Sequence, residues 1–261
     1  MKGSVEMKNK SLVIILLISL LVLTSTTLTN ASALETIRAE EEISFAMSGE
    51  YPPFNYYELN ELAGFDVDVA KEIASRMDAE AEFVTTAWDG IIPGLTSGHY
   101  DTILGSMAIT DQRLEAVNFT IPYYYSGAQI VVTEDSDIDG PTDIEGKTVG
   151  VVTGTTFEED AQELGAEINS YEGDNETMME LRNGRVDAVI TDRVVGLEFL
   201  NEGFDIEFAG ELLRQETMAI ALRKESDRLL VELNQILFEM HQDGTLTEIS
   251  EEWFDADITQ R

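Results

Sequence analysis

The stretch DTILGSMAITDQR, residues 101–113, runs from a strand-like segment through a turn of small and hydroxyl-bearing side chains to an arginine. Such a turn would hold Arg113 at the mouth of a cleft. The planar guanidinium offers paired donors that match a carboxylate in bidentate geometry. The pattern therefore predicts a carboxylate ligand, and a surface arginine that pairs with Asp111 or Glu115 is the alternative.

The chain is strongly acidic and has ample apolar content for a packed core. Its 261 residues are 43% hydrophobic, enough for one large or two modest domains. The 51 acidic residues outnumber the 16 basic ones, giving a net charge of −35 that is spread along the sequence. Because an acidic surface repels phosphates, we expect no nucleic-acid partner. Since salt screens self-repulsion, the charge also indicates a salt-adapted source.

The first residues have the pattern of an export signal. Lysines precede an apolar run at 12–23, and Ala31-Ser32-Ala33 follows as a small-residue cleavage site. This arrangement predicts a secretory signal over residues 1–33, with export to the periplasm or cell surface. If the threonine- and serine-rich tail up to Leu28 lengthens the apolar run, the alternative is an uncleaved membrane anchor.

The chain contains no cysteine, which removes several kinds of chemistry. Disulfides, thiolate metal sites, cysteine nucleophiles and a lipid anchor at the cleavage site are excluded. The two histidines, His99 and His241, lie far apart in the sequence. We therefore predict no metal site.

Strand-like and helix-like segments alternate along both halves of the chain. The main ones are strands at 43–47, 81–85, 128–133, 149–152, 186–190 and 217–222, and helices at 64–77, 176–183 and 226–242. Such alternation predicts an α/β fold. An acidic segment at 34–42 has the composition of a linker, and the polar gap at 134–140 that of a domain crossing. Asp66 and Asp68, at the start of a helix, are expected to be structural.

Several candidate binding residues follow predicted strands. Tyr51 lies in a loop stiffened by two prolines, and Trp88 lies at a strand-to-helix junction. A glycine-bearing turn at 153–156 precedes a helix, whose free amides attract anions. Asp192 follows an apolar strand, where an acid is either a helix cap or a ligand for a cation. Core packing is the alternative for both rings, and it is what we expect for Phe54.

These landmarks occur in the order found in one protein family. They are Tyr51-Pro52-Pro53-Phe54, Gly64-Phe65-Asp66-Val67-Asp68, Trp88-Asp89-Gly90-Ile91-Ile92-Pro93, Ile109-Thr110-Asp111-Gln112-Arg113, Pro122-Tyr123, Gly154-Thr155-Thr156 and Gly184-Arg185-Val186-Asp187-Ala188 followed by Asp192. By their number, order and spacing, residues 43–255 resemble the extracellular solute-binding proteins of polar amino-acid ABC importers, which include glutamine- and histidine-binding proteins.

The resemblance implies a fold and a set of partners. The fold would be of the periplasmic-binding-protein type II, in which two Rossmann-like α/β lobes are joined by two hinge strands. Lobe 1 would comprise residues 43–129 and 222–261, and lobe 2 residues 130–221. The protein would be a monomeric receptor without a cofactor or catalysis. It would bind a small L-amino acid between its lobes and meet the membrane subunits of an ABC importer.

The resemblance also implies roles for particular residues. Arg113 would clamp the ligand's α-carboxylate together with the backbone amides of Ala108 and Thr156. Asp192 would take the α-ammonium group. The remaining site residues would be Tyr51 and Trp88, stacked on the ligand side chain, and Ser48, Ser106, Thr153, Gly154 and Thr191.

Two departures from the family pattern bear on specificity. Relatives that bind cationic side chains often carry an aspartate at the position of Ser48, and Ala108 replaces a frequent serine or threonine. Without an acid at residue 48, and with Thr191 beside Asp192, a neutral polar, glutamine-like ligand is expected. Glu50 could supply the missing charge, which leaves a basic ligand as an alternative.

An enzymatic alternative rests on the same fold. It is similar to that of periplasmic cyclohexadienyl dehydratases, which need a catalytic acid in the cleft. Glu50 is the candidate for that acid.

Overall fold

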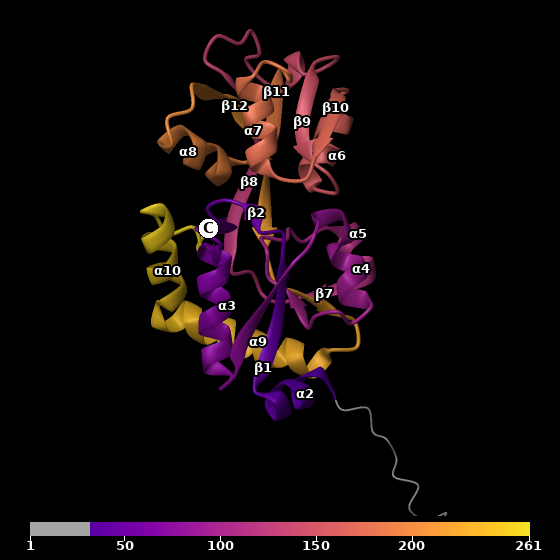
Figure 1. Cartoon of the computed structure of the whole chain (residues 1–261), viewed down its shortest axis with the longest axis vertical. Helices are drawn as coiled ribbons and strands as arrows, with labels where there is room; N and C mark the ends of the chain where they lie inside the picture. Colours follow the sequence, from indigo (N-terminus) through magenta and orange to yellow (C-terminus); the bar gives the residue numbers. More distant parts are fainter. Residues whose placement is uncertain (1–31) are drawn as a thin grey trace, which may run out of the picture. The chain divides into compact units, whose positions relative to one another are not determined.

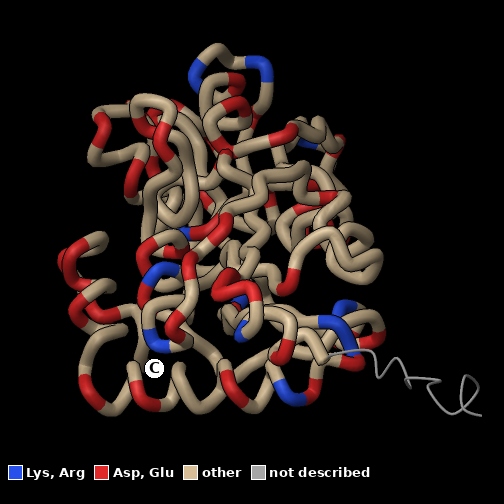
Figure 2. The backbone as a smooth tube through the Cα atoms, turned by 60° about the horizontal axis from the view of Figure 1, so that its bottom comes forward, with Lys and Arg blue, Asp and Glu red and all other residues tan. Residues whose placement is uncertain are grey.

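The computed structural model describes residues 32–261 (Figure 1). The predicted signal segment, and with it the anchor alternative, lies outside these residues except for Ser32 and Ala33. Among the helices of residues 32–261, none is long and apolar enough to cross a membrane. Acidic residues occur throughout the described backbone and basic ones are few (Figure 2). Salt adaptation stays a prediction.

The first lobe is built on a five-stranded sheet in the order β5-β1-β6-β13-β7. Its strands are β1 (Glu42–Met47), β5 (Glu80–Thr85), β6 (Thr102–Ile103), β7 (Val117–Phe119) and β13 (Ala221–Arg223). β1 is parallel to β5 and β6, whereas β13 is antiparallel to β6 and β7. A small second sheet consists of β2 (Glu50–Tyr51), β3 (Asn55–Glu58) and β4 (Glu61–Ala63). The loop between β1 and β2 thus starts at the carboxyl end of a parallel strand, where ligands bind in α/β folds.

The first lobe also contains helices. They are α2 (Ala33–Glu40), α3 (Phe65–Arg76), α4 (Ile91–Thr96), α5 (Asp111–Ala116), α9 (Asp227–Asp243) and α10 (Thr245–Phe254), with a 3-10 turn η1 (Trp88–Gly90). All of these α-helices except α5 bury part of their surface. The helix predicted at 64–77 is observed as α3, and Phe65, Val69 and Ile73 on one of its faces are fully buried.

The second lobe has its own five-stranded sheet in the order β10-β9-β11-β8-β12. The strands are β8 (Tyr124–Thr133), β9 (Thr148–Val152), β10 (Glu167–Tyr171), β11 (Ala188–Asp192) and β12 (Ile206–Met218). The helices are α6 (Thr156–Glu163), α7 (Asp174–Arg182) and α8 (Arg193–Asn201), with a 3-10 turn η2 (Pro141–Asp143). β10, β9 and β11 are parallel, and their carboxyl ends lead into the loops before α7, α6 and α8.

β8 and β12 also connect the two lobes. They pair antiparallel from Tyr124 with Met218 to Thr133 with Ile206, with an irregularity between Ala209 and Arg214. We call residues 124–128 and 214–218 the hinge ribbon. Figure 1 shows these strands running from the second lobe towards the first.

The predicted two-lobed α/β fold is therefore confirmed, but its boundaries differ from those expected. β8 pairs with β12 from Tyr124 onwards, and Ala221 already belongs to β13 of the first sheet. The expected crossings after residues 129 and 221 thus fall too late in the sequence. The gap at 134–140 lies between β8 and β9 of one sheet, so its interpretation as a domain crossing is wrong.

The acidic linker expected at 34–42 is also wrong, because most of it forms α2. Ser32 and Glu35 form a reciprocal capping box at the start of this helix. Leu34 and Ile37, three residues apart on one face, are only 7% and 2% exposed. Ion pairs join α2 to α9 through Glu35 with Arg228 and through Arg38 with Glu232. The acids lie on the exposed face of this packed helix, and they give the segment the composition of a linker.

Substituting Ile37 by alanine tests this correction. The change would empty a buried site and should lower the free energy of unfolding by about 2–5 kcal/mol, as measured by chemical denaturation. Arg38→Ala on the exposed face is the matched control and should cost less than about 1 kcal/mol. Equal, small effects of the two substitutions would show that residues 33–40 do not pack as a helix.

Candidate ligand-binding site

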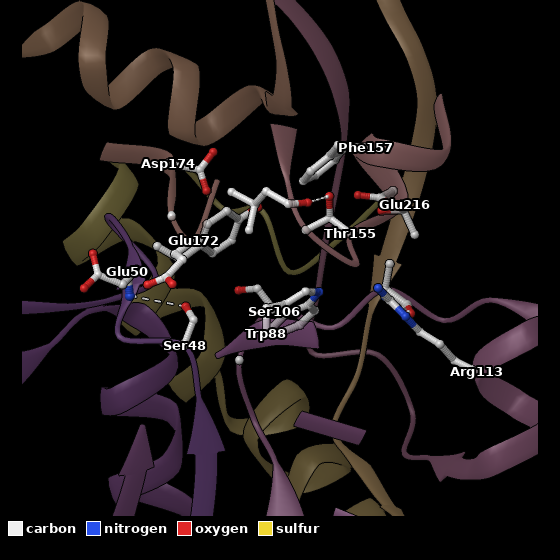
Figure 3. A pocket seen from close by; sticks show the side chains of 16 residues that line it. Ser48, Glu50, Trp88, Ser106, Arg113, Thr155, Phe157, Glu172, Asp174 and Glu216 are labelled. Atoms are coloured by element: carbon white, nitrogen blue, oxygen red, sulfur yellow. Dashed lines mark hydrogen bonds between the residues drawn. The ribbon is translucent and has the colours of Figure 1, made fainter. Parts of the chain in front are cut away.

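A cavity lies between the two lobes, at the carboxyl ends of β1, β6 and β9 (Figure 3). We call it the ligand pocket. The first lobe contributes Ser48, Glu50, Tyr51, Trp88, Gly105, Ser106, Ala108 and Arg113; the second contributes Val152, Thr155, Thr156, Phe157, Glu172, Gly173 and Asp174; the hinge ribbon contributes Glu216. The pocket thus brings together seven of the eleven residues expected from the sequence.

Arg113 is held in place by neutral groups. Its backbone N–H donates to the side chain of Thr110, which caps α5 (3.2 Å), and its Nη1 donates to the carbonyl oxygen of Ala108 (2.9 Å). The guanidinium lies over the Trp88 ring, 5.6 Å from the centroid. None of the ion pairs among residues 32–261 involves Arg113, so the surface pairing with Asp111 or Glu115 is not what the structure shows.

Thr156 faces the pocket from the start of α6, where the first backbone amides have no partner within the helix. Its hydroxyl donates to Oε1 of Glu216 (2.7 Å). Thr153 and Gly154 do not line the pocket. Thr153 bonds the carbonyl of Tyr171, and the Gly154 N–H donates to the Glu158 carboxylate (2.8 Å). The expected contacts at 153 and 154 therefore support the turn and do not reach the ligand space.

Asp192 is fully buried and is not among the residues that line the pocket. Its Oδ1 caps α8 by accepting from the Val194 N–H (2.7 Å), and it also accepts from the Ser126 hydroxyl (2.6 Å). Its Oδ2 has no hydrogen-bond partner. The carboxylate can therefore serve in both roles predicted from the sequence, because Oδ1 caps the helix and Oδ2 is left for a cation. Thr191 does not line the pocket, and its hydroxyl donates to Asp174 (2.5 Å).

Three acids of the pocket were missed by the sequence interpretation: Glu172, Asp174 and Glu216. With Glu50 they make four carboxylates around a lining whose one cationic residue is Arg113. Glu172 directly follows β10 and Asp174 is the first residue of α7, so both lie at a strand-to-helix junction like those of Trp88 and Asp192. Glu216 lies within a strand, and no local sequence pattern marks it.

The first-lobe half of the pocket is organised by Asp66, which is fully buried. Its Oδ2 accepts from Asn55 Nδ2 (2.7 Å) and the Ser106 hydroxyl (2.8 Å), and its Oδ1 accepts from the Tyr123 hydroxyl (2.6 Å). Asn55 in turn accepts from the Gly49 N–H at 2.9 Å. Ser106 has a positive φ of 58°, uncommon for a residue with a side chain. Asp66 was expected to be structural, and its role is to join these pocket loops.

The aromatic residues divide as expected. Phe54 is fully buried and stacks on Tyr51 at 5.2 Å and on Tyr124 at 5.0 Å. Tyr51 lines the pocket, as does Trp88. Since Trp88 also lies against Arg113, it supports the guanidinium whether or not it stacks on a ligand. Stacking of both rings on the ligand side chain remains a prediction.

Burial changes the protonation of the acids around the pocket. It raises the pKa of Asp174 and of Asp192 to about 7 each, and that of Asp66 to about 6. Hydrogen bonds from Thr191, Ser126 and other donors oppose the increase but do not cancel it. Within residues 32–261 no group of three or more His, Asp or Glu side chains is placed to hold a metal ion.

These raised values predict how stability depends on pH. A carboxyl group with a pKa near 7 in the native state and 3.8 when unfolded binds more protons in the native state between those values. The free energy of unfolding of the ligand-free protein should therefore rise as the pH falls from about 8 to about 5, as measured by denaturant midpoints. Asp174→Asn should flatten this dependence, whereas Asp187→Asn should not. A midpoint that falls over this interval would contradict the raised pKa values.

Comparison with known proteins places this geometry in a family. Residues 43–256 match the model of the bacterial extracellular solute-binding proteins, family 3. The chain is 33% identical to the L-cystine-binding protein TcyJ of Escherichia coli K12, over 87% of this chain and 88% of that one. It is 35% identical to the ABC transporter arginine-binding protein 1 of the same strain, over 83% and 92%.

A solved structure is similar to this chain in both sequence and fold. The ancestral amino acid-binding protein AncCDT-1, a precursor of cyclohexadienyl dehydratase, superposes with a TM-score of 0.80 at 33% identity, over 85% of this chain and 100% of that chain. The family match covers both lobes and the hinge ribbon. The chain therefore belongs to the bacterial extracellular solute-binding proteins of family 3.

Proposed function

We propose that this protein binds an L-amino acid between its two lobes and delivers it to the membrane subunits of an ABC importer. The observation that carries the proposal is Arg113, which has no ionic partner among residues 32–261 and lies in a pocket whose other charged residues are all acids. A guanidinium fixed by neutral groups in this way is prepared for a carboxylate that comes from outside. Because relatives in this family of solute-binding proteins bind cystine and arginine, the α-carboxylate of an amino acid is the natural candidate.

The ligand would be held from both sides of the cleft. Arg113 and the loops around Ser106 belong to the first lobe, whereas Thr156 and Asp192 belong to the second. A ligand that contacts both lobes stabilises the closed arrangement by the contacts that the open arrangement lacks. Asp192, with one oxygen unpaired, is the expected acceptor of the α-ammonium group.

The pocket acids favour a cationic side chain. Glu50, Glu172 and Asp174 line the part of the pocket away from Arg113, and an ionised carboxylate only accepts hydrogen bonds. A guanidinium or ammonium group supplies donors and opposite charge together. Ser48 in place of an acid is the observation that favours the glutamine-like ligand expected from the sequence, and a carboxamide also offers two donors. We therefore propose a basic amino acid first and glutamine second.

The dehydratase alternative also has an observation in its favour, because Glu50 lines the pocket and AncCDT-1 is a relative. Binding alone requires no general acid, and the role of a carboxylate clamp explains Arg113 without any catalytic residue. We therefore propose a receptor and not an enzyme.

A thermal-shift screen of the twenty amino acids separates these ligands. A micromolar ligand at about 1 mM adds about 4 kcal/mol of stability. The largest shift should come from arginine or lysine and a smaller one from glutamine, and Asp174→Asn should narrow the difference. A largest shift with glutamine that Asp174→Asn leaves unchanged would favour the neutral ligand. Conversion of prephenate to phenylpyruvate would instead support the enzyme.

Arg113→Ala tests the carboxylate clamp. Removing one partner of a buried charged pair costs about 3–5 kcal/mol, which corresponds to affinity at least about a hundredfold weaker by isothermal titration calorimetry. Arg38→Ala, on the exposed face of α2, changes the same charge far from the pocket and should leave affinity unchanged. If Arg113→Ala binds as tightly as the unaltered protein, the clamp is assigned to the wrong residue.

A further inference from the structure

Two buried carboxylate oxygens near the ligand pocket have neither a hydrogen-bond donor nor an ionic partner. They are Oδ2 of Asp192 and Oε2 of Glu216. A third buried carboxylate oxygen, Oδ2 of Asp160, has no hydrogen bond but lies 3.0 Å from Arg214 Nη2. Leaving a buried carboxylate oxygen without a donor is costly. Among residues 32–261, this cost is concentrated at Asp192 and Glu216.

The other oxygen of Glu216 is firmly held. Oε1 accepts from the Thr156 hydroxyl (2.7 Å) and from Arg214 Nη2 (3.0 Å), and Arg214 is itself paired with Asp160. Glu216 is only 5% exposed. With one oxygen fixed by two donors, the carboxylate cannot turn to satisfy the other. The position of Oε2 is therefore fixed by the hydrogen bonds to Oε1.

Glu216 also lies in the right part of the pocket for an α-amino acid. Its negative charge is the leading one that raises the pKa of Arg113 against the lowering effect of burial, so it is the acid that acts most strongly on the guanidinium. The α-ammonium and α-carboxylate groups of an amino acid are attached to one carbon atom. An acceptor of the ammonium group must therefore lie near the carboxylate clamp, and Figure 3 shows Glu216 on the same side of the pocket as Arg113.

Asp192 and Glu216 lie on either side of Ser126, whose hydroxyl donates to Asp192 Oδ1 (2.6 Å) and which is the pairing partner of Glu216 in the hinge ribbon. Burial is the main reason for the raised pKa of Asp192, and the negative charges of Glu216 and Asp174 raise it further. Burial and, after it, the charges of the same acids raise the pKa of Tyr51, which lines the pocket. A cation placed between two such carboxylates would remove their repulsion and supply donors to both unpaired oxygens.

We propose that Glu216 accepts the ligand's α-ammonium group jointly with Asp192. The assignment rests on the proposed function, and it adds a specificity-determining residue from the hinge ribbon. Glu216 would connect the ammonium group to the Thr156 end of α6 and, through Arg214, to Asp160 of the same helix. The ligand would thereby contact the ribbon about which the lobes move.

The test compares Glu216→Gln, Asp192→Asn and the double variant by isothermal titration calorimetry. The probes are the L-amino acid that binds best in the screen and its des-amino analogue, in which hydrogen replaces the ammonium group. We expect Glu216→Gln to reduce the preference for the amino acid over the analogue at least tenfold. The double variant should lose less than the product of the two single losses, because both carboxylates serve one group.

Glu159→Gln is the matched control. Glu159 is exposed, lies outside the pocket lining and also acts electrostatically on Arg113. It should leave the preference unchanged. A Glu216→Gln variant that weakens or strengthens both probes equally would overturn the proposal, because the effect would then concern the carboxylate end or the fold.

A ligand-free measurement keeps this proposal separate from the proposed function. If Asp192 and Glu216 repel each other, Glu216→Gln should shift the melting temperature more favourably when residue 192 is aspartate than when it is asparagine. Additive shifts would show that the carboxylates do not interact, and would overturn the proposal. If the unaltered protein bound no amino acid, the proposed function would fail, and the joint site would fail with it even when the melting shifts are coupled.

Discussion

The first-lobe half of the pocket depends on the buried carboxylate of Asp66. It has no cation beside it, so its charge is stabilised by donors from Asn55, Ser106 and Tyr123. Those donors come from the strand after the Pro-Pro loop, the loop after β6 and the residue before the hinge ribbon. A fully satisfied buried network of this kind is rigid, because breaking any one bond exposes a carboxylate oxygen to an apolar surrounding. The loops that carry Ser48 and Ser106 are therefore fixed before a ligand arrives.

The second-lobe half follows a different rule. Asp174 and Asp192 each have one oxygen held by a hydroxyl, from Thr191 and Ser126. Burial raises both pKa values to about 7, further than the value of about 6 for Asp66, so these two carboxylates receive less compensation from the protein than Asp66 does. The buried carboxylate of the first lobe is thus fully hydrogen-bonded, whereas those of the second lobe have acceptor capacity left for a ligand. In the proposed function, a cationic ligand group that entered the cleft would supply the missing donors and would thereby link binding to closure through the same contacts.

The sequence predicted the parts of this arrangement that have a local pattern. Alternating strands and helices, the apolar face of α3 and the placement of Arg113 after a hydroxyl-rich turn follow from short-range chemistry. Glu216 lies within a strand, and only its pairing across the ribbon brings it to the pocket, so no neighbouring residue reveals it. α2 was missed for the same reason. Its acids suggested a linker, and the packing of Ile37 that makes it a helix involves residues distant in the sequence. Thr191 was expected at the ligand, and it instead orients Asp174.

The distribution of charge between surface and cleft decides which acids matter for binding. With a net charge of −35, the whole molecule attracts cations and repels anions at long range, but salt screens that field beyond a distance of about 3 Å at 1 M. Water-excluding contacts inside the cleft are screened far less. In concentrated salt, the exposed acids would therefore stop contributing to selectivity, whereas Asp174, Asp192 and Glu216 would keep their effect. The nearby acids that attract a cationic group of a ligand repel its carboxylate. Arg113 must therefore attract the carboxylate against the field of these acids. A single guanidinium freed from internal ion pairs, with its position fixed by neutral groups, meets that requirement better than one already neutralised by a neighbouring acid.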